Sequence, residues 1–132
     1  MIQIPISYGE LFDKISILKI KQDKILNPLK LILVQKELKA LMNIGATLPI
    51  EKIISLYHSL QRINLRLWNV EDKLRKMELK GKFDQKFINA ARSVYILNDK
   101  RFYYKNKINQ ILGSEISEVK QYVKYDTGKK EK

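Results

Sequence analysis

The sequence predicts an all-α protein of four helices, organised around a long antiparallel helical hairpin. Two apolar series, spaced alternately three and four residues apart, carry this prediction, one from Ile53 to Met77 and the other from Phe87 to Ile111. Such spacing lines one stripe of a helix with apolar side chains, and a complete stripe needs a second helix lying along it. Only about four residues separate the predicted helices, at about 49–80 and 85–112, so they must run antiparallel.

Signals for helix ends place two shorter helices before this hairpin. The sequence Ser7-Tyr8-Gly9-Glu10 matches a capping box, in which serine and glutamate each satisfy a backbone amide of the first turn. A helix is therefore expected from here to about Leu26. Asn27 followed by Pro28 suits an N-cap and a first helical position, which predicts a second helix over about 28–43.

The ends of the chain are expected to lie outside this helical frame. Isoleucine alternates with other residues over 2–6, which predicts a short extended segment able to bury one face. Residues 1–125 form a single predicted domain, and residues 126–132 a disordered basic tail. Two paths stay open for residues 114–125. Their apolar side chains either pack onto the helices or pair, over 118–124, with the extended N-terminal segment.

Composition excludes several classes of function. The chain has 132 residues and no cysteine, so disulfides and thiol chemistry are excluded, which fits a reducing compartment. The only histidine, His58, falls on a predicted solvent-facing position, and no glycine-rich phosphate loop occurs, so we expect neither a metal site nor a cofactor. No basic leader precedes an apolar run, and no run approaches the ~20 residues that span a bilayer. We therefore expect a cytoplasmic protein without membrane insertion.

The net charge of +12 raises the question of a polyanionic partner. Lysine far outnumbers arginine and is spread along the chain, with a mild excess on the last helix. On that helix Lys100, Tyr103 and Lys107 share a face, a mixture of bases and an aromatic ring that could contact nucleic acid. An ordinary solvated basic face is the simpler interpretation, so nucleic-acid binding is possible but not favoured.

Polar residues set into the apolar helices are the candidate functional residues. Arg101 interrupts the apolar stripe of the last helix, and the register of the hairpin places it opposite Asn64. A buried guanidinium needs acceptors, which Asn64 and a carboxylate of the first helix, such as Glu10 or Asp13, could supply. The cluster then either fixes helix register as an ion-pair network or binds a small anion. Its predicted members are Glu10, Asp13, Lys14, Asn64, Arg92, Asn98, Asp99 and Arg101.

Short motifs extend along nearly the whole chain, namely Ile4-Pro5-Ile6-Ser7-Tyr8-Gly9-Glu10-Leu11, Asp13-Lys14-Ile15, Ala91-Arg92-Ser93-Val94-Tyr95, Asn98-Asp99, Arg101 and Gly113-Ser114-Glu115. Together they resemble a short bacterial and phage family of all-helical proteins, known as a domain of unknown function. The resemblance implies a unit that stands alone, and it brings no established activity.

The long helix has more apolar surface than its seam uses. Ile54, Leu65 and Trp68 fall on a second stripe, which predicts a homo-oligomer or a protein partner. The expected function is therefore that of a helical interaction or scaffolding module that associates with itself, rather than an enzyme. One alternative is a small-anion binder or enzyme using Lys14, Arg92 and Arg101 between helices, and another is weak nucleic-acid binding through the last helix.

Overall fold

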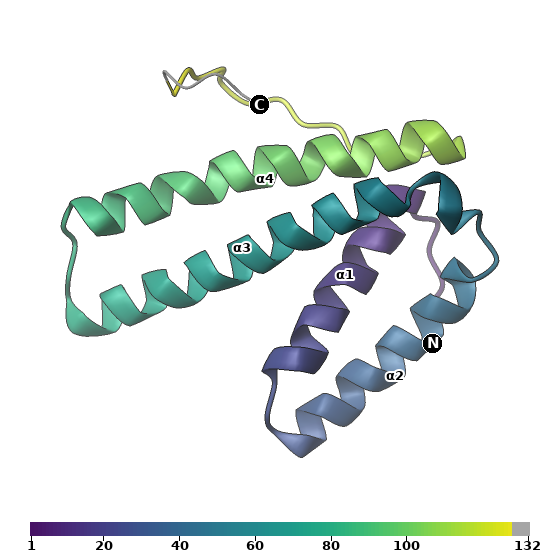
Figure 1. Cartoon of the computed structure of the whole chain (residues 1–132), viewed down its shortest axis with the longest axis horizontal. Coiled ribbons are helices and arrows are strands. Elements are labelled where there is room, and N and C mark those ends of the chain that lie inside the picture. The colour runs from purple at the N-terminus through teal and green to yellow at the C-terminus, as the bar shows by residue number, and fades with distance from the viewer. Residues whose placement is uncertain (128–132) are drawn as a thin grey trace.

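The computed structural model describes residues 1–127 and contains four α-helices, with no β-strand among those residues. The all-α prediction is confirmed. Two hairpins, α1–α2 and α3–α4, meet at one end and diverge at the other (Figure 1). The helices are α1 (Tyr8–Lys24), α2 (Pro28–Gly45), α3 (Ile54–Lys80) and α4 (Gln85–Leu112), and a short 3₁₀ turn, η1 (Ile50–Lys52), precedes α3.

Most helix ends lie where local chemistry predicts them. The side chains of Ser7, Asn27 and Asp84 each accept a hydrogen bond from the backbone amide three residues later, at 3.1, 3.1 and 3.2 Å. Gly81 and Gly113 follow α3 and α4 with φ of 64° and 69°, the left-handed conformation that glycine adopts without strain. Each of these helix ends is determined by residues within one turn of it, so its position could be predicted from the sequence.

Three boundaries differ from the prediction. The first helix ends at Lys24 rather than near residue 26, and the second continues to Gly45 rather than to residue 43. The third begins at Ile54 rather than near residue 49. The backbone of Ile53 has φ −126° and ψ 8°, which separates the 3₁₀ turn after Pro49 from the regular helix.

The Ser7 cap provides a stability test. We expect Ser7→Ala to lower the free energy of unfolding by about 0.5–2 kcal/mol, because the amide of Glu10 loses its acceptor. Urea denaturation measures this loss. Ser59→Ala is the control, since the hydroxyl of Ser59 bonds only an exposed Arg62 side chain. Equal stability of the two variants would contradict a stabilising cap.

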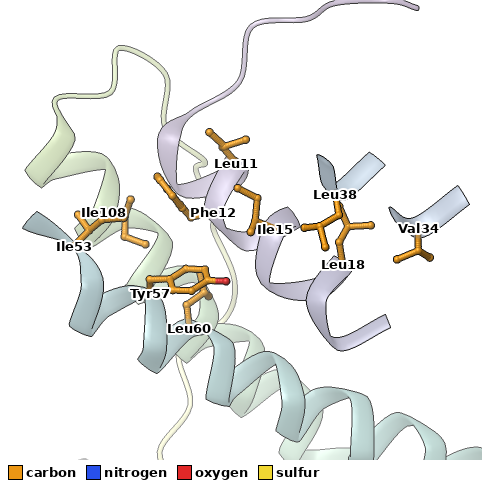
Figure 2. Close-up of a cluster of buried hydrophobic side chains, with 10 residues drawn as sticks. All are labelled: Leu11, Phe12, Ile15, Leu18, Val34, Leu38, Ile53, Tyr57, Leu60 and Ile108. Carbon is orange, nitrogen blue, oxygen red and sulfur yellow. The ribbon is translucent and has the colours of Figure 1, made fainter. Parts of the chain in front are cut away.

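The hydrophobic core lies where the two hairpins meet. Leu11, Phe12, Ile15 and Leu18 of α1 pack between α2 and the α3–α4 pair (Figure 2). Their buried partners are Val34, Leu38, Ile53, Tyr57, Leu60 and Ile108. Toward the α3–α4 turn, the seam residues Leu74 and Met77 are only partly buried, because neither α1 nor α2 reaches this part of the hairpin. The α3–α4 pair therefore projects as a two-helix arm.

The two chain ends differ from the expectations. Ile2 and Ile4 are 89% and 70% exposed, so the N-terminal segment buries no apolar face. Residues 114–127 form neither helix nor strand and run back beside α4 (Figure 1). Val119 and Val123 of this segment are exposed, so both predicted paths for 114–125 were wrong. Most of the predicted disordered tail, 128–132, lies outside the described residues.

Polar and aromatic contacts, rather than apolar packing, hold this returning segment. The ammonium of Lys120 lies 5.3 Å from the ring centre of Phe102, and the ring of Tyr125 meets that of Tyr95 edge-on at 5.1 Å. The Tyr125 hydroxyl also donates a hydrogen bond to the carboxylate of Asp99. Such pairs are not detected by searching for apolar periodicity, which explains the failed expectation.

Candidate functional site

A buried polar cluster lies between α1, α3 and α4, beside the apolar core. Asp13 is its centre, with a fully buried side chain, and Ser16 stands one turn later on the same face of α1. Asn64 of α3 donates its side-chain amide to Asp13 Oδ1 at 2.9 Å and to Ser16 Oγ at 2.7 Å. The single Asn64 amide thereby joins α3 to two successive turns of α1.

Arg101 of α4 approaches the same carboxylate from the other side. Its Nε donates to Asp13 Oδ1 at 2.9 Å and its Nη2 to Oδ2 at 2.5 Å, a bidentate pair. The pKa of Arg101 is raised, first by the hydrogen bond to Asp13 and in spite of its burial. Asn98 contributes only a long contact of 3.5 Å to Arg101 Nη1. The guanidinium therefore remains charged and is engaged chiefly by Asp13.

Lys105, one turn after Arg101 on α4, is the second cation of the cluster and is buried. Its ammonium lies 2.8 Å from Glu10, 2.6 Å from Glu118 and 4.0 Å from Asp13. Burial acts to lower the pKa of Lys105, but hydrogen bonds to Glu10 and Glu118 outweigh it and raise the pKa overall. The pKa of Glu118 is lowered because the bond and charge of Lys105 outweigh its partial burial. This ion pair fastens the returning segment to α4 and α1.

Gly9 lets the start of α1 approach the backbone of α4. The Gly9 amide donates to Asn109 Oδ1 at 2.6 Å, and the Tyr8 amide faces Ser114 Oγ at 3.4 Å. A Cβ added to Gly9 would lie 2.3 Å from the carbonyl oxygen of Lys105, far inside van der Waals contact. The absence of a side chain here fixes how closely α1 and α4 pack, and so how deeply Asp13 reaches toward Arg101.

The structure brings together some of the predicted site residues and leaves others apart. Glu10, Asp13, Asn64 and Arg101 converge, with Asn98 at their edge. Asn64 donates to Asp13, which corrects the expectation that it would accept a bond from Arg101. The other three are exposed, namely Lys14 at 3.8 Å from Glu10, Arg92, and Asp99 beside Tyr125.

Four members of the cluster were not among the predicted site residues. Ser16 and Lys105 follow Asp13 and Arg101 by three and four residues, so helical periodicity could have found them once the first pair was chosen. Asn109 lies a further turn along α4 and contacts a backbone amide, which no sequence pattern marks. Glu118 lies in an irregular segment, where its position depends on the path of the chain.

The arrangement favours a structural role over anion binding. Arg101 and Lys105 each already contact a carboxylate, so neither is left to attract a small anion. Among residues 1–127, no group of three or more His, Asp or Glu side chains could hold a metal ion. The cluster instead ties three helices and the returning segment together, and removal of one partner would leave a buried charge uncompensated.

Fold and cluster together define an all-α domain whose helices are joined by a buried ion-pair network. The chain belongs to a family of unknown function, DUF6165, whose model matches residues 2–128. No curated protein and no solved structure is significantly similar to it. Within the described part of the chain, no helix is both long enough and apolar enough to cross a bilayer.

Proposed function

We propose that this protein is a helical interaction module that associates with a second copy of itself through the outer face of α2. The observation that carries the proposal is that α2 is apolar on two opposite faces. One face packs Val34 and Leu38 onto α1. Four large aliphatic side chains of the opposite face are well exposed, namely Leu29 (75%), Ile32 (59%), Leu33 (67%) and Ile44 (55%).

A helix with apolar side chains on both faces is typically covered on both. In the described residues α2 has substantial contact with α1 alone, and Leu26, beside its first turn, is also 91% exposed. The sequence of 128–132 is Gly-Lys-Lys-Glu-Lys, which offers no apolar side chain to cover this face. We therefore favour a partner from outside this sequence as the group that covers the outer face of α2. The gain in free energy from covering it is roughly 25 cal/mol per Å² of apolar surface removed from water.

A second copy fits this face because the face is complementary to itself. In an antiparallel pair with a two-fold axis beside Lys36 and Glu37, Leu33 lies opposite Ala40 and Leu29 opposite Ile44. Each Lys36 then lies next to Glu37 of the second copy, whereas a parallel pair would place like charges together. Leu33 thereby meets the small side chain of Ala40, Leu29 forms an aliphatic pair with Ile44, and the charges are balanced across the axis.

The proposal predicts a dimer that a single charged substitution on the outer face of α2 dissociates. We expect wild-type protein to show a mass of about 31 kDa by light scattering, twice 15.6 kDa. We expect Leu33→Glu to show the monomer mass, with a helical circular dichroism spectrum that shows the fold is kept. Leu79→Glu is the matched control, because Leu79 is 88% exposed but lies on the α3–α4 arm. It should leave the dimer intact.

Two results would contradict this proposal. One is a wild-type monomer over a wide concentration range. The other is a dimer that survives Leu33→Glu but dissociates on Leu65→Glu, which would favour the stripe predicted on α3. In that stripe Ile54 and Leu65 are 44% and 39% exposed, and Trp68 is partly buried. It is therefore a less exposed surface than the outer face of α2.

A further inference from the structure

The turn of the α3–α4 arm carries a groove of about 280 Å³ lined mostly by lysines. It lies at the end of the molecule remote from α1 and α2 (Figure 1). Five lysines, one methionine and one aspartate line it, namely Lys73, Lys76, Met77, Lys80, Lys82, Asp84 and Lys86. Clefts lined by charges of one sign concentrate counter-ions of the other sign.

Most of these lysines have no carboxylate partner in the described residues. Only Lys76 forms an ion pair, at 3.0 Å from Asp72. One residue before it, Arg75 likewise pairs with Glu71 at 2.6 Å. Both are pairs between side chains four residues apart on α3, and no such ion pair occurs between Lys76 and the turn in the described residues. In the part of the chain that the structure describes, Lys73, Lys80, Lys82 and Lys86 thus make no ion pair.

Two placements in the groove carry an unfavourable electrostatic interaction. Lys76 and Lys80 are four residues apart on α3, where like charges repel, although the dipole of α3 favours a cation at Lys80 in its last turn. Lys86 stands in the first turn of α4, where the helix dipole favours negative charge. Residues that break local rules at one place tend to mark a functional site. A bound anion would relieve both conflicts at once.

We propose that this groove binds an anion carrying two or more phosphoryl groups. Ammonium groups on flexible stems suit several phosphoryl oxygens spread along a groove, and the volume suits a short chain of phosphates rather than a large ligand. Asp84 also lines the groove, and one of its two carboxylate oxygens is engaged, because Oδ1 accepts the Phe87 amide as the helix cap, at 3.2 Å.

This chemistry could come from a free polyphosphate or from a phosphorylated lipid headgroup. Leu79 and Phe83, which are 88% and 57% exposed near the same turn, are side chains that a lipid surface would take up. A free anion would leave them untouched. The two sources therefore differ in whether these apolar residues contribute to binding.

Calorimetric titration with inorganic triphosphate at low ionic strength tests the groove itself. We expect saturable binding that weakens at least about tenfold in Lys80→Gln/Lys86→Gln, which neutralises one lysine from each helix. The control, Lys24→Gln/Lys52→Gln, removes the same charge from exposed positions outside the groove and should bind as the wild type does. Equal weakening in both double variants would overturn the proposal in favour of diffuse attraction.

Vesicle flotation distinguishes a phosphorylated lipid headgroup from a free polyphosphate as the ligand of the groove. Phosphatidylcholine vesicles are compared with and without a bisphosphorylated phosphatidylinositol, using wild type and Leu79→Ser/Phe83→Ser. Binding that needs both the phosphorylated lipid and the two apolar side chains assigns a headgroup, whereas triphosphate binding without vesicle binding assigns a free anion. Failure to bind either probe would overturn the proposal. Because the groove is distant from α2, loss of the dimer and loss of anion binding are independent results.

Discussion

Replacing Asp13 by alanine is expected to lower the free energy of unfolding by up to about 3–5 kcal/mol, the usual cost of removing one partner from a buried ion pair, since Asp13 is fully buried and Arg101 is 29% exposed. The Asp13 carboxylate is fully buried and accepts bonds from Arg101 and Asn64. Without it, the guanidinium of Arg101 keeps its charge but loses its strongest acceptor. Chemical denaturation followed by circular dichroism measures the loss.

Two further variants separate the charge from the shape of the site. Asp13→Asn keeps an acceptor of the same size and should lose less stability. The double variant Asp13→Leu/Arg101→Met removes both charges together and should recover most of the loss, as apolar replacements of buried pairs often do. Arg101→Met alone should be destabilising, because it leaves the buried carboxylate of Asp13 without its bidentate partner. Unchanged unfolding of Asp13→Ala would contradict a structural network.

The elements of this fold could be predicted because their signals are local. Ser7, Asn27 and Asp84 cap helices through their own side chains, and Gly81 and Gly113 end helices through their backbone conformation. Each signal acts within one turn and does not depend on the rest of the molecule. The apolar seams then favour pairing of α3 with α4, because the short connection between these helices places the two stripes against each other.

The arrangement of the two hairpins could not be predicted in the same way. The outer face of α2 was not recognised, because the residues that pack on α1 already explained the helix as amphipathic. Leu29, Ile32 and Leu33 precede Val34 in the sequence but lie on the far side of the helix. Periodicity shows which residues share a face, but it does not show which faces remain uncovered once the helices are placed.

Part of the polar cluster followed from the sequence, and the rest depended on tertiary contacts. An arginine in an apolar stripe requires a partner, and the hairpin register indicated Asn64 nearby. The choice between Glu10 and Asp13 stayed open because both lie on α1 within one turn. The structure uses both, Asp13 for Arg101 and Glu10 for Lys105. That division depends on the register of α1 against α4, which Gly9 determines.

Gly9→Ala is accordingly expected to destabilise the protein by about 1–3 kcal/mol or more, the cost of overpacking against a contact that cannot yield easily. Helix propensity alone predicts the opposite sign, since alanine stabilises a helix interior by up to about 1 kcal/mol relative to glycine. The added Cβ would lie 2.3 Å from the carbonyl oxygen of Lys105 and 2.9 Å from Asn109 Oδ1. α1 would have to move away from α4, which strains the 2.6 Å bond from the Gly9 amide.

Gly45→Ala is the matched control for this substitution. Gly45 is also buried at the end of a helix, but a Cβ there would first meet Ile15 Cδ1, at 3.3 Å, the mobile end of a side chain. Its effect on the urea midpoint should therefore be small. If Gly9→Ala unfolds at the same or a higher urea concentration than wild type, the close approach of α1 to α4 is wrong. The buried position of Asp13 against Arg101 would then lose its geometric basis.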